Sequence, residues 1–222
     1  MNAYGKVIIG FSAPFVGMYN RNGSNVTYTN GMRLARGVDV SLKPETSDDN
    51  EFYADGALAE SDGGKFKRGT ASYTVDGLHD TAERFIFGLP EPEEMSVGAD
   101  KTVKVMKYGD KANIPYVGVG FIIWYQSDGV VTYQPMILPK VKFITHGTEA
   151  KSKEDQKNWQ TQSLESTIFR DDTPDHNWKW LLEEQATEED AIAILKAVLS
   201  VAEAAKPEPA EAGEAGEEES DG

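Results

Sequence analysis

The sequence predicts a mainly β protein with flanking helices. Apolar and polar residues alternate with a period of two in residues 33–42 and again in residues 70–76, which is typical of half-buried strands. An Asp-Gly pair at positions 128 and 129 stands between two apolar runs, a strong signal for a two-residue hairpin turn. Helical patterns are short, one near residue 80 and one after residue 187.

The first apolar stretch, residues 7–18, is interpreted as a strand. It is shorter than the ~20 residues that a membrane-spanning helix needs, and it contains Pro14 and Gly17. Its valines and isoleucines suit a pleated sheet. The only basic residue before it is Lys6 and no convincing cleavage site follows it, so a secretory signal is disfavoured and no membrane anchor is expected.

Residues 43–68 form a long polar segment between two predicted strands. A loop of this length without a core of its own is uncommon unless it binds a partner or is disordered. Phe52 and Tyr53 favour binding, because adjacent aromatics in a polar loop bury a large apolar area when a partner covers them. The alternative is that both rings fold back onto the core. Each flanking strand places apolar residues on one face: Leu34, Val38, Val40 and Leu42 before the segment, and Ala71, Tyr73 and Val75 after it.

A short helix is predicted over residues 80–88. Asp80 and Glu83 have the spacing of a capping box, and Gly88 is placed to end the helix. The helix is therefore expected as an insertion between strands.

Sheet patterning returns at residue 116. The odd-numbered positions of residues 117–125 are apolar, and apolar residues also occupy positions 122 and 124, so both faces of this strand need cover. A type I′ turn at residues 128 and 129 sets Trp124 across from Tyr133. Pro135 and Pro139 then indicate an edge strand or irregular pairing.

The character of the chain changes towards the C-terminus. Residues 147–158 are expected to be an exposed loop and residues 160–169 an extended segment. Thr187 begins a helix, and residues 203–222, rich in Glu, Ala and Gly, are expected to be disordered when free. An aromatic anchor precedes the helix and an apolar stripe follows its length: Trp178, Trp180, Leu181 and Leu182, then Ile192, Leu195 and Leu199.

The net charge is −15. Residues 203–222 contain eight acidic residues and one lysine and carry seven of these charges, so the rest of the chain is still acidic. Binding of duplex DNA draws on cationic side chains, so sequence-independent nucleic-acid binding is disfavoured. The absence of cysteine excludes disulfides and thiolate chemistry and fits assembly in a reducing cytoplasm.

Patterns for catalysis or metal binding are sparse. His79, His146 and His176 lie far apart in the sequence without metal-ligand spacing, and each is interpreted as a turn residue. Carboxylate pairs such as Asp171 and Asp172 are expected as solvated charge in so acidic a chain. We therefore expect no enzyme, no cofactor and no metal site.

Five segments carry a resemblance to a known family. They are residues 37–45 (GVDVSLKPE), 52–55 (FYAD), 67–78 (KRGTASYTVDGL), 116–135 and 138–143. In order and spacing they resemble the major tail proteins, or tail-tube proteins, of siphovirus-type bacteriophages over most of residues 5–170. The resemblance implies a β-sandwich or open-barrel tail-tube fold. It also implies hexameric rings that stack into a hollow tube, through which genome DNA passes without specific binding.

The resemblance also implies an organisation and partners. Residues 1–175 would form the tail-tube β domain, with residues 43–68 as an inter-subunit loop. The residue pattern itself adds a helical region over residues 176–202 and a disordered acidic tail over residues 203–222. Partners would be further copies of the chain, a tape-measure protein and a tail-terminator protein. The location would be the virion tail, after assembly in the host bacterial cytoplasm. No immunoglobulin-like appendage, as in longer members, is recognisable.

Six residues are expected at an oligomer interface. A basic cluster lies near the end of the long polar segment, residues 43–68. It is either solvated or paired with acidic groups of a neighbouring subunit, since complementary charge fixes register. The six residues are Phe52, Tyr53, Asp55, Lys65, Lys67 and Arg68.

A second hypothesis is a stand-alone β-sandwich module that binds glycans or proteins. It would bind glycans through Trp124, Trp159 or Trp178. An enzyme is the third hypothesis, and it requires a pocket in which two carboxylates with shifted pKa values face each other. A binding module stays monomeric at high concentration, whereas a tube protein forms rings or polymers.

Overall fold

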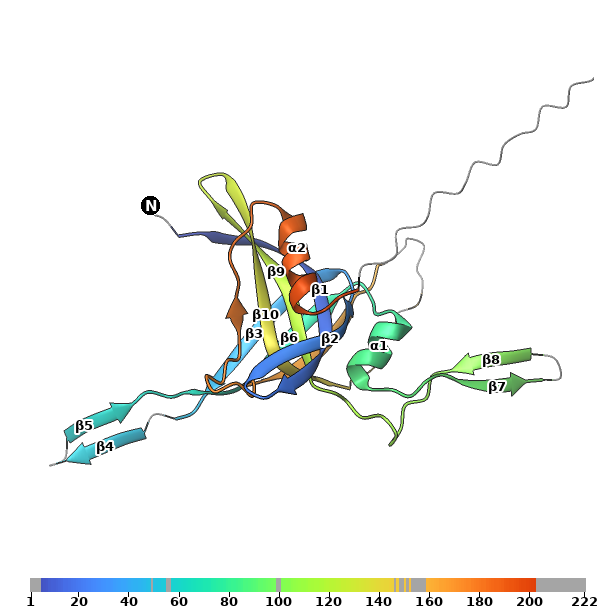
Figure 1. The fold of residues 1–222 in the computed structure, drawn as a ribbon, viewed down its shortest axis with the longest axis horizontal. Helices are drawn as coiled ribbons and strands as arrows, with labels where there is room; N and C mark the ends of the chain where they lie inside the picture. Colours follow the sequence, from blue (N-terminus) through green and yellow to red (C-terminus); the bar gives the residue numbers. More distant parts are fainter. Residues whose placement is uncertain are drawn as a thin grey trace, which may run out of the picture.

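An eight-stranded antiparallel sheet forms the body of the protein in a computed structural model (Figure 1). The structure describes residues 5–48, 50–54, 57–98, 101–145, 147, 150, 152 and 159–202, with residues 50–62 described by their backbone alone. The strand order is β2-β1-β9-β10-β11-β6-β3, and β12 pairs with β10. The strands are β1 (Val7–Asn22), β2 (Asn25–Arg33), β3 (Gly37–Thr46), β6 (Phe66–Val75), β9 (Val117–Ser127), β10 (Val130–Ile144), β11 (Gln162–Phe169) and β12 (Trp180–Leu181).

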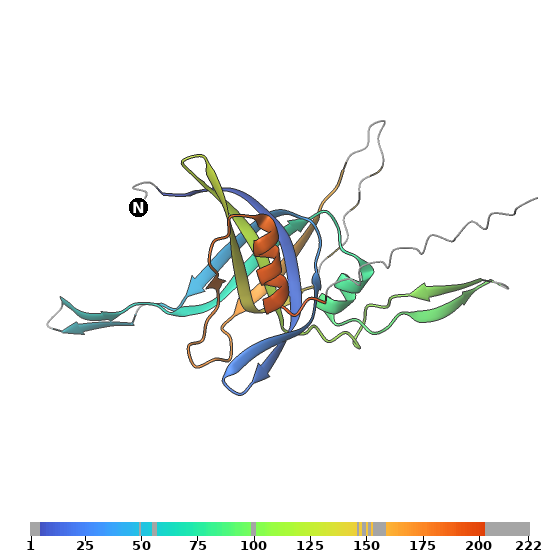
Figure 2. The ribbon, with the colours of Figure 1, turned by 45° about the horizontal axis from the view of Figure 1, so that its top comes forward.

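The sheet curls so that β3 approaches β1 around a single interior (Figure 2). Side chains from β1, β6, β9, β10 and β11 fill this interior, and α1 (Asp80–Phe87) contributes Ile86 and Phe87 to it. Tyr73 and Phe121 are fully buried there. The prediction of a mainly β fold with flanking helices is confirmed.

A second core lies on the outside of the same sheet. There α2 (Glu188–Val198) packs against β1, β2, β9 and β10 and buries Leu195 and Leu199 (Figure 2). Both faces of β9 are therefore covered, as its apolar pattern predicts, with Phe121 inside and Ile122 beneath α2. The predicted helix start is confirmed, because the Thr187 hydroxyl accepts a hydrogen bond from the Asp190 amide.

Close approach of α2 depends on glycine in the sheet. A Cβ atom at Gly31 would lie 2.1 Å from the carbonyl oxygen of Leu199, and one at Gly120 would lie 2.9 Å from a methyl of Leu195. Any larger residue at Gly31 would push the end of α2 off the sheet.

The predicted strand over residues 33–42 is interrupted. β2 ends at Arg33 and β3 begins at Gly37, because the chain turns where the amide of buried Leu34 donates to the Pro14 carbonyl at 2.8 Å. A register shift between Gly37 and Asp39 then turns Val38 outward. Val38 is 56% exposed, so the prediction that it shares a face with Leu34 is wrong.

The predicted helix at residue 80 is confirmed, but its capping box is wrong. The N-cap is His79, whose side chain makes no capping hydrogen bond, and Asp80 lies in the first turn. The Glu83 carboxylate instead accepts a hydrogen bond from the Tyr108 hydroxyl. Gly88 ends the helix at φ 59°, a left-handed conformation that glycine adopts without strain.

The predicted hairpin between β9 and β10 is confirmed. Asp128 and Gly129 both have positive φ, as a type I′ turn requires, and Trp124 lies opposite Tyr133 with ring centroids 5.2 Å apart. Pro135 and Pro139 precede residues 140–144, the part of β10 that pairs with β11. Beside the prolines, the two-residue strand β12 is the one described strand that pairs with β10 on that side, so the predicted edge is only partly covered there. The alternative of irregular pairing is confirmed by a register shift between Leu138 and Val141.

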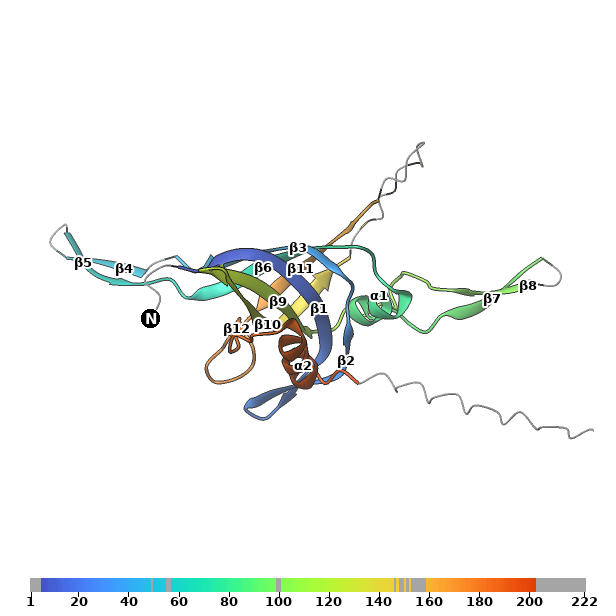
Figure 3. The ribbon, with the colours of Figure 1, turned by 90° about the horizontal axis from the view of Figure 1, so that it is seen from above.

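Two hairpins project from opposite sides of the barrel (Figures 1 and 3). Where a loop is predicted over residues 43–68, β4 (Asn50–Ala54) pairs with β5 (Ala57–Asp62), so a loop without secondary structure is wrong for this stretch. On the other side β7 (Glu93–Val97) pairs with β8 (Lys101–Val105).

Some predictions fall on residues that the structure does not describe. The acidic tail over residues 203–222, His146 and most of the loop over residues 147–158 lie outside the described residues. Within the described part of the chain, neither helix is long and apolar enough to cross a membrane.

Candidate assembly surface

The six residues predicted at an interface lie on one hairpin and its base. Phe52 and Tyr53 belong to β4, where only the backbone is described, and Asp55 lies outside the described residues. Lys65, Lys67 and Arg68 lie where the hairpin joins the barrel, and the Arg68 guanidinium lies 2.7 Å from Glu45 of the paired strand. This exposed ion pair contributes little to stability but gives Arg68 a partner in its own chain.

The base of this hairpin is held by the aromatic anchor that the sequence predicts. The ring of Trp178 stacks on Phe66 at 4.5 Å with an interplanar angle of 7°. The Ser47 amide donates to the Lys65 carbonyl at 2.8 Å, which continues the ladder beyond the barrel. The hairpin therefore leaves the barrel from a fixed position.

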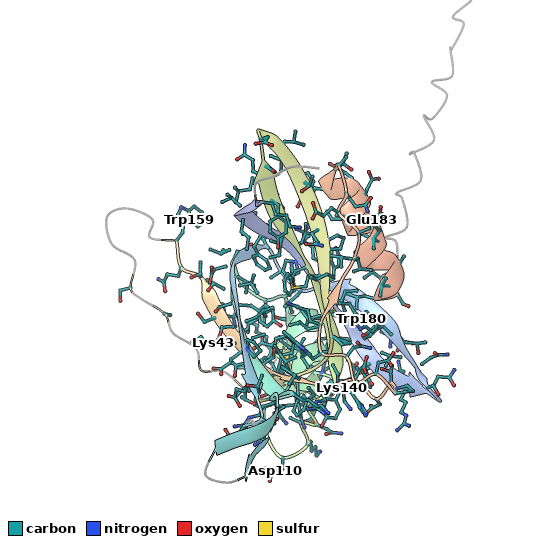
Figure 4. The ribbon with its side chains drawn as sticks, turned by 90° about the vertical axis from the view of Figure 1, so that its left-hand side faces the viewer. Lys43, Asp110, Lys140, Trp159, Trp180 and Glu183 are labelled. Carbon is teal, nitrogen blue, oxygen red and sulfur yellow. The ribbon has the colours of Figure 1, made fainter. Side chains whose placement is uncertain are left out.

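The three tryptophans of the binding-module hypothesis do not form one platform. Trp124 donates to the Ser12 hydroxyl at 2.8 Å and packs on Tyr133, while Trp178 stacks on Phe66. Trp159 is 86% exposed, beside the segment that leads into β11 (Figure 4).

The second hairpin was missed by sequence reasoning, in which Glu93 and Glu94 belong to the carboxylate pairs interpreted as solvated charge. The signal was present as apolar residues alternating on either side of Gly98, whose φ is 72°. Met95 and Val97 are about half exposed, at 47% and 46%. At the base of the hairpin, a hydrogen bond from Lys107 lowers the pKa of Glu93.

Among the open sheet edges of the described strands, two face each other. β2 pairs with β1 from Phe15 onward, so on that side residues 7–13 of β1 have no paired strand in the described chain, and β3 pairs only with β6. The two edges meet where Phe11 packs on Gly37, at which a Cβ atom would lie 2.2 Å from the ring. We call this gap between β1 and β3 the seam.

Exposed apolar side chains gather at the seam. Four exposed large apolar residues lie on its two strands, and unpaired edges with apolar side chains favour pairing with another chain. They are Val7 at 65%, Ile8 at 63%, Val38 at 56% and Ile9 at 46% exposed.

The outer side of β3, β6 and β11 carries short polar side chains in register. In one row Lys43 pairs with Thr70 and Thr70 with Thr167, and in the next row Ser72 pairs with Glu165. These side chains are exposed or half-buried, whereas α2 packs on the other half of the sheet. We call this surface the polar face; its residues are Asp39, Ser41, Lys43, Thr70, Ser72, Thr74, Ser163, Glu165 and Thr167.

The polar face continues onto β10 and has balanced charge. Lys142 of β10 pairs with Thr167 and is half-buried. Lys43 and Lys142 match Asp39 and Glu165 in number, so this surface has no net charge although the whole chain carries −15.

A cluster of charged and polar side chains lies at β1 and β10 beside this surface. Lys140 lies 2.8 Å from Asp172, and the Tyr19 hydroxyl donates to the same carboxylate at 2.9 Å. The hydrogen bond from Lys140 lowers the pKa of Asp172, and burial raises the pKa of Tyr19 to about 12. These contacts fasten the segment before β12 to β1 and β10.

The neighbouring carboxylate of Asp171 has a separate role. One of its oxygens accepts hydrogen bonds from the Thr173 amide, the Thr173 hydroxyl and the Asn177 amide, which closes a turn. Asp171 and Asp172 are therefore engaged by different partners. Among the described residues, no group of three or more His, Asp or Glu side chains is placed to hold a metal ion.

Neither models of protein families nor curated protein sequences match this chain.

Proposed function

We propose that this chain is the subunit of a tail tube of a siphovirus-type bacteriophage, a structural protein without catalytic activity. The polar face carries the proposal. It is a charge-balanced side of a curled sheet on which neither described helix packs, bounded by an open edge and fixed in orientation by the barrel core.

Closure into a ring would cover the two edges of the seam. The seam offers one edge on β1 and another on β3, so the β3 edge of one copy meets the β1 edge of the next in a head-to-tail contact that closes by rotation. Val38 and the apolar residues at the start of β1 then become buried. The resemblance to tail-tube proteins supports six copies per ring.

The polar face would line the lumen. Its serine and threonine side chains are short, and its charges cancel, so DNA meets neither a cationic surface that holds it nor a strong repulsive field. The same lumen would contain a tape-measure protein before DNA enters, and a terminator protein would close the last ring.

The two hairpins would join one ring to the next. They project from opposite sides of the barrel, so each subunit reaches towards two neighbours along the tube axis (Figure 3). The β4–β5 hairpin carries Phe52 and Tyr53, and burial of both rings between subunits would supply apolar contact area.

Negative-stain microscopy of concentrated protein tests the proposal, with rings and stacked tubes as the expected result. Joint replacement Phe52→Ala and Tyr53→Ala is expected to leave the monomer folded and to abolish stacking. Trp159→Ala serves as a control, because it removes an exposed aromatic side chain outside both hairpins. Strongly lowered melting of the double variant, with tubes still formed, would place the two aromatics in the core.

Exposure of Trp159 favours the second candidate function, a monomeric glycan-binding module. The same sample distinguishes the two functions. A protein that remains monomeric at high concentration and loses glycan binding in Trp159→Ala would replace the tube proposal.

A further inference from the structure

We propose that the acidic C-terminal segment, residues 203–222, binds to a cationic groove of its own chain beside the end of β2. The groove has a volume of about 580 Å³ and is lined by two stretches of chain, residues 33–36 and residues 76–79. This proposal does not depend on the tube function.

The groove has a buried apolar floor and a cationic rim. Leu34 is buried at its base, while Arg33 and Arg36 are exposed. The Arg36 side chain and amide both bond Asp76, which satisfies the acidic residue of the lining. Arg33 donates to the Ala35 carbonyl at 3.3 Å, and within the described residues no carboxylate pairs with it. The guanidinium of Arg33 is therefore open to an anionic partner.

The chain leaves the described structure at a fixed point next to this groove. The Gly31 amide donates to the Ser200 carbonyl at 3.0 Å, and Val201 forms a parallel bridge with Gly31 of β2. Because the bridge is parallel, the chain after Val201 heads in the direction of β2, towards Arg33. Two residues along a strand span only ~7 Å, so the acidic segment starts within reach of the groove.

Charge and length both suit this occupant. Residues 203–222 carry eight acidic residues and one lysine. Twenty extended residues reach up to ~70 Å, far more than the groove requires. The attraction is electrostatic and exposed to solvent, so it weakens as the Debye length falls to ~3 Å near 1 M salt.

A spin label on the full-length chain tests the proposal. The protein contains no cysteine, so Ala212→Cys provides one labelling position within the acidic segment. With the nitroxide attached, amides of residues 33–36 and 77–79 are expected to lose intensity at low salt and to recover near 1 M salt. Measurement at a concentration where light scattering detects no polymer keeps the result separate from tube formation.

The chain offers a matched pair of arginine variants. Arg33→Gln should restore the groove amides at low salt, whereas Arg21→Gln should leave them broadened. Both arginines are exposed on β1 or β2, and each donates from Nε to a carbonyl two residues further on. Equal effects of the two variants would overturn a specific groove.

Three other outcomes would also overturn the proposal. Broadening centred on Lys196 would place the segment on the outer face of α2. Uniform or absent broadening would mean that the segment has no preferred site. Broadening in a mixture of isotope-labelled chains and separate spin-labelled chains would show that the segment binds another copy.

Discussion

The two halves of the barrel wall have opposite outer surfaces although one sheet forms both. Over β1, β2 and β9 the outer surface is apolar and glycine-rich and is covered by α2. Over β3, β6 and β11 it is mainly serine and threonine with a few charges, and neither described helix covers it. The interior core beneath both halves is continuous. We therefore expect the polar face to contribute little to folding of the single chain, which leaves its composition available for function.

A substitution at the seam is expected to have the largest effect, because it should abolish assembly. Val38→Lys places a charge at the open edge of β3, on a side chain that is already 56% exposed. We expect unchanged monomer stability and loss of ring formation, measured by thermal melting and by sedimentation of concentrated protein.

A matched substitution lies on the covered half. Ala193→Lys adds the same charge on the exposed face of α2, which the proposal places outside the tube, and it should assemble normally. Loss of assembly in both variants would mean that added charge alone prevents association.

Substitutions in the two halves should differ sharply in their effect on the free energy of unfolding. Leu195→Ala leaves a cavity under α2 and is expected to lower the free energy of unfolding by about 2–5 kcal/mol. Thr70→Ala on the polar face should change it by no more than about 0.5 kcal/mol. Urea unfolding of dilute monomer measures both, and similar losses would show that the polar face supports the fold.

Sequence predicted the parts of the fold that depend on local pattern. The turn at Asp128 and Gly129 determined the register, so the pairing of Trp124 with Tyr133 followed directly. The break before Gly37 could not be predicted, because it depends on Leu34 reaching the carbonyl of Pro14, far away on another strand.

The candidate surface was less accessible to sequence reasoning than the fold. Phe52 and Tyr53 could be predicted at an interface because they are aromatics in a polar stretch. The strands β4 and β5 could not be predicted, because a polar hairpin lacks the apolar alternation that marks a strand. The polar face alternates clearly along each strand, yet which neighbours form its rows depends on long-range pairing. Only the three-dimensional register brings Thr70 and Thr167 together.

The cluster at Lys140 links the covered half to the segment before β12, and it predicts a pH dependence. Because the folded pKa of Asp172 is lowered, its ionised form stabilises the protein above the unfolded pKa near ~4, and this stability is lost as the pH falls through the folded pKa. Lys140→Met should cost about 1–3 kcal/mol at neutral pH and progressively less below pH ~4. Unfolding of both proteins across pH measures this, and a constant difference would assign the loss to packing.

The smallest expected effect concerns the acidic segment and the salt dependence of assembly. Full-length protein should polymerise poorly at low salt and better near 1 M salt, where the Debye length is ~3 Å, while protein that ends at Ala202 should polymerise at either. Two mechanisms would both make polymerisation improve with salt. One is repulsion between acidic segments, and the other is docking of the segment beside Gly37, where the open edge of β3 begins.

The variant Arg33→Gln distinguishes these two mechanisms. If docking blocks the edge, the variant releases the segment and polymerises at lower salt than the natural sequence. If repulsion alone acts, the variant is more negative by one charge and polymerises less readily. We expect the first result from light scattering across a salt series, and identical curves for the full-length and shortened proteins would remove any electrostatic role of the segment.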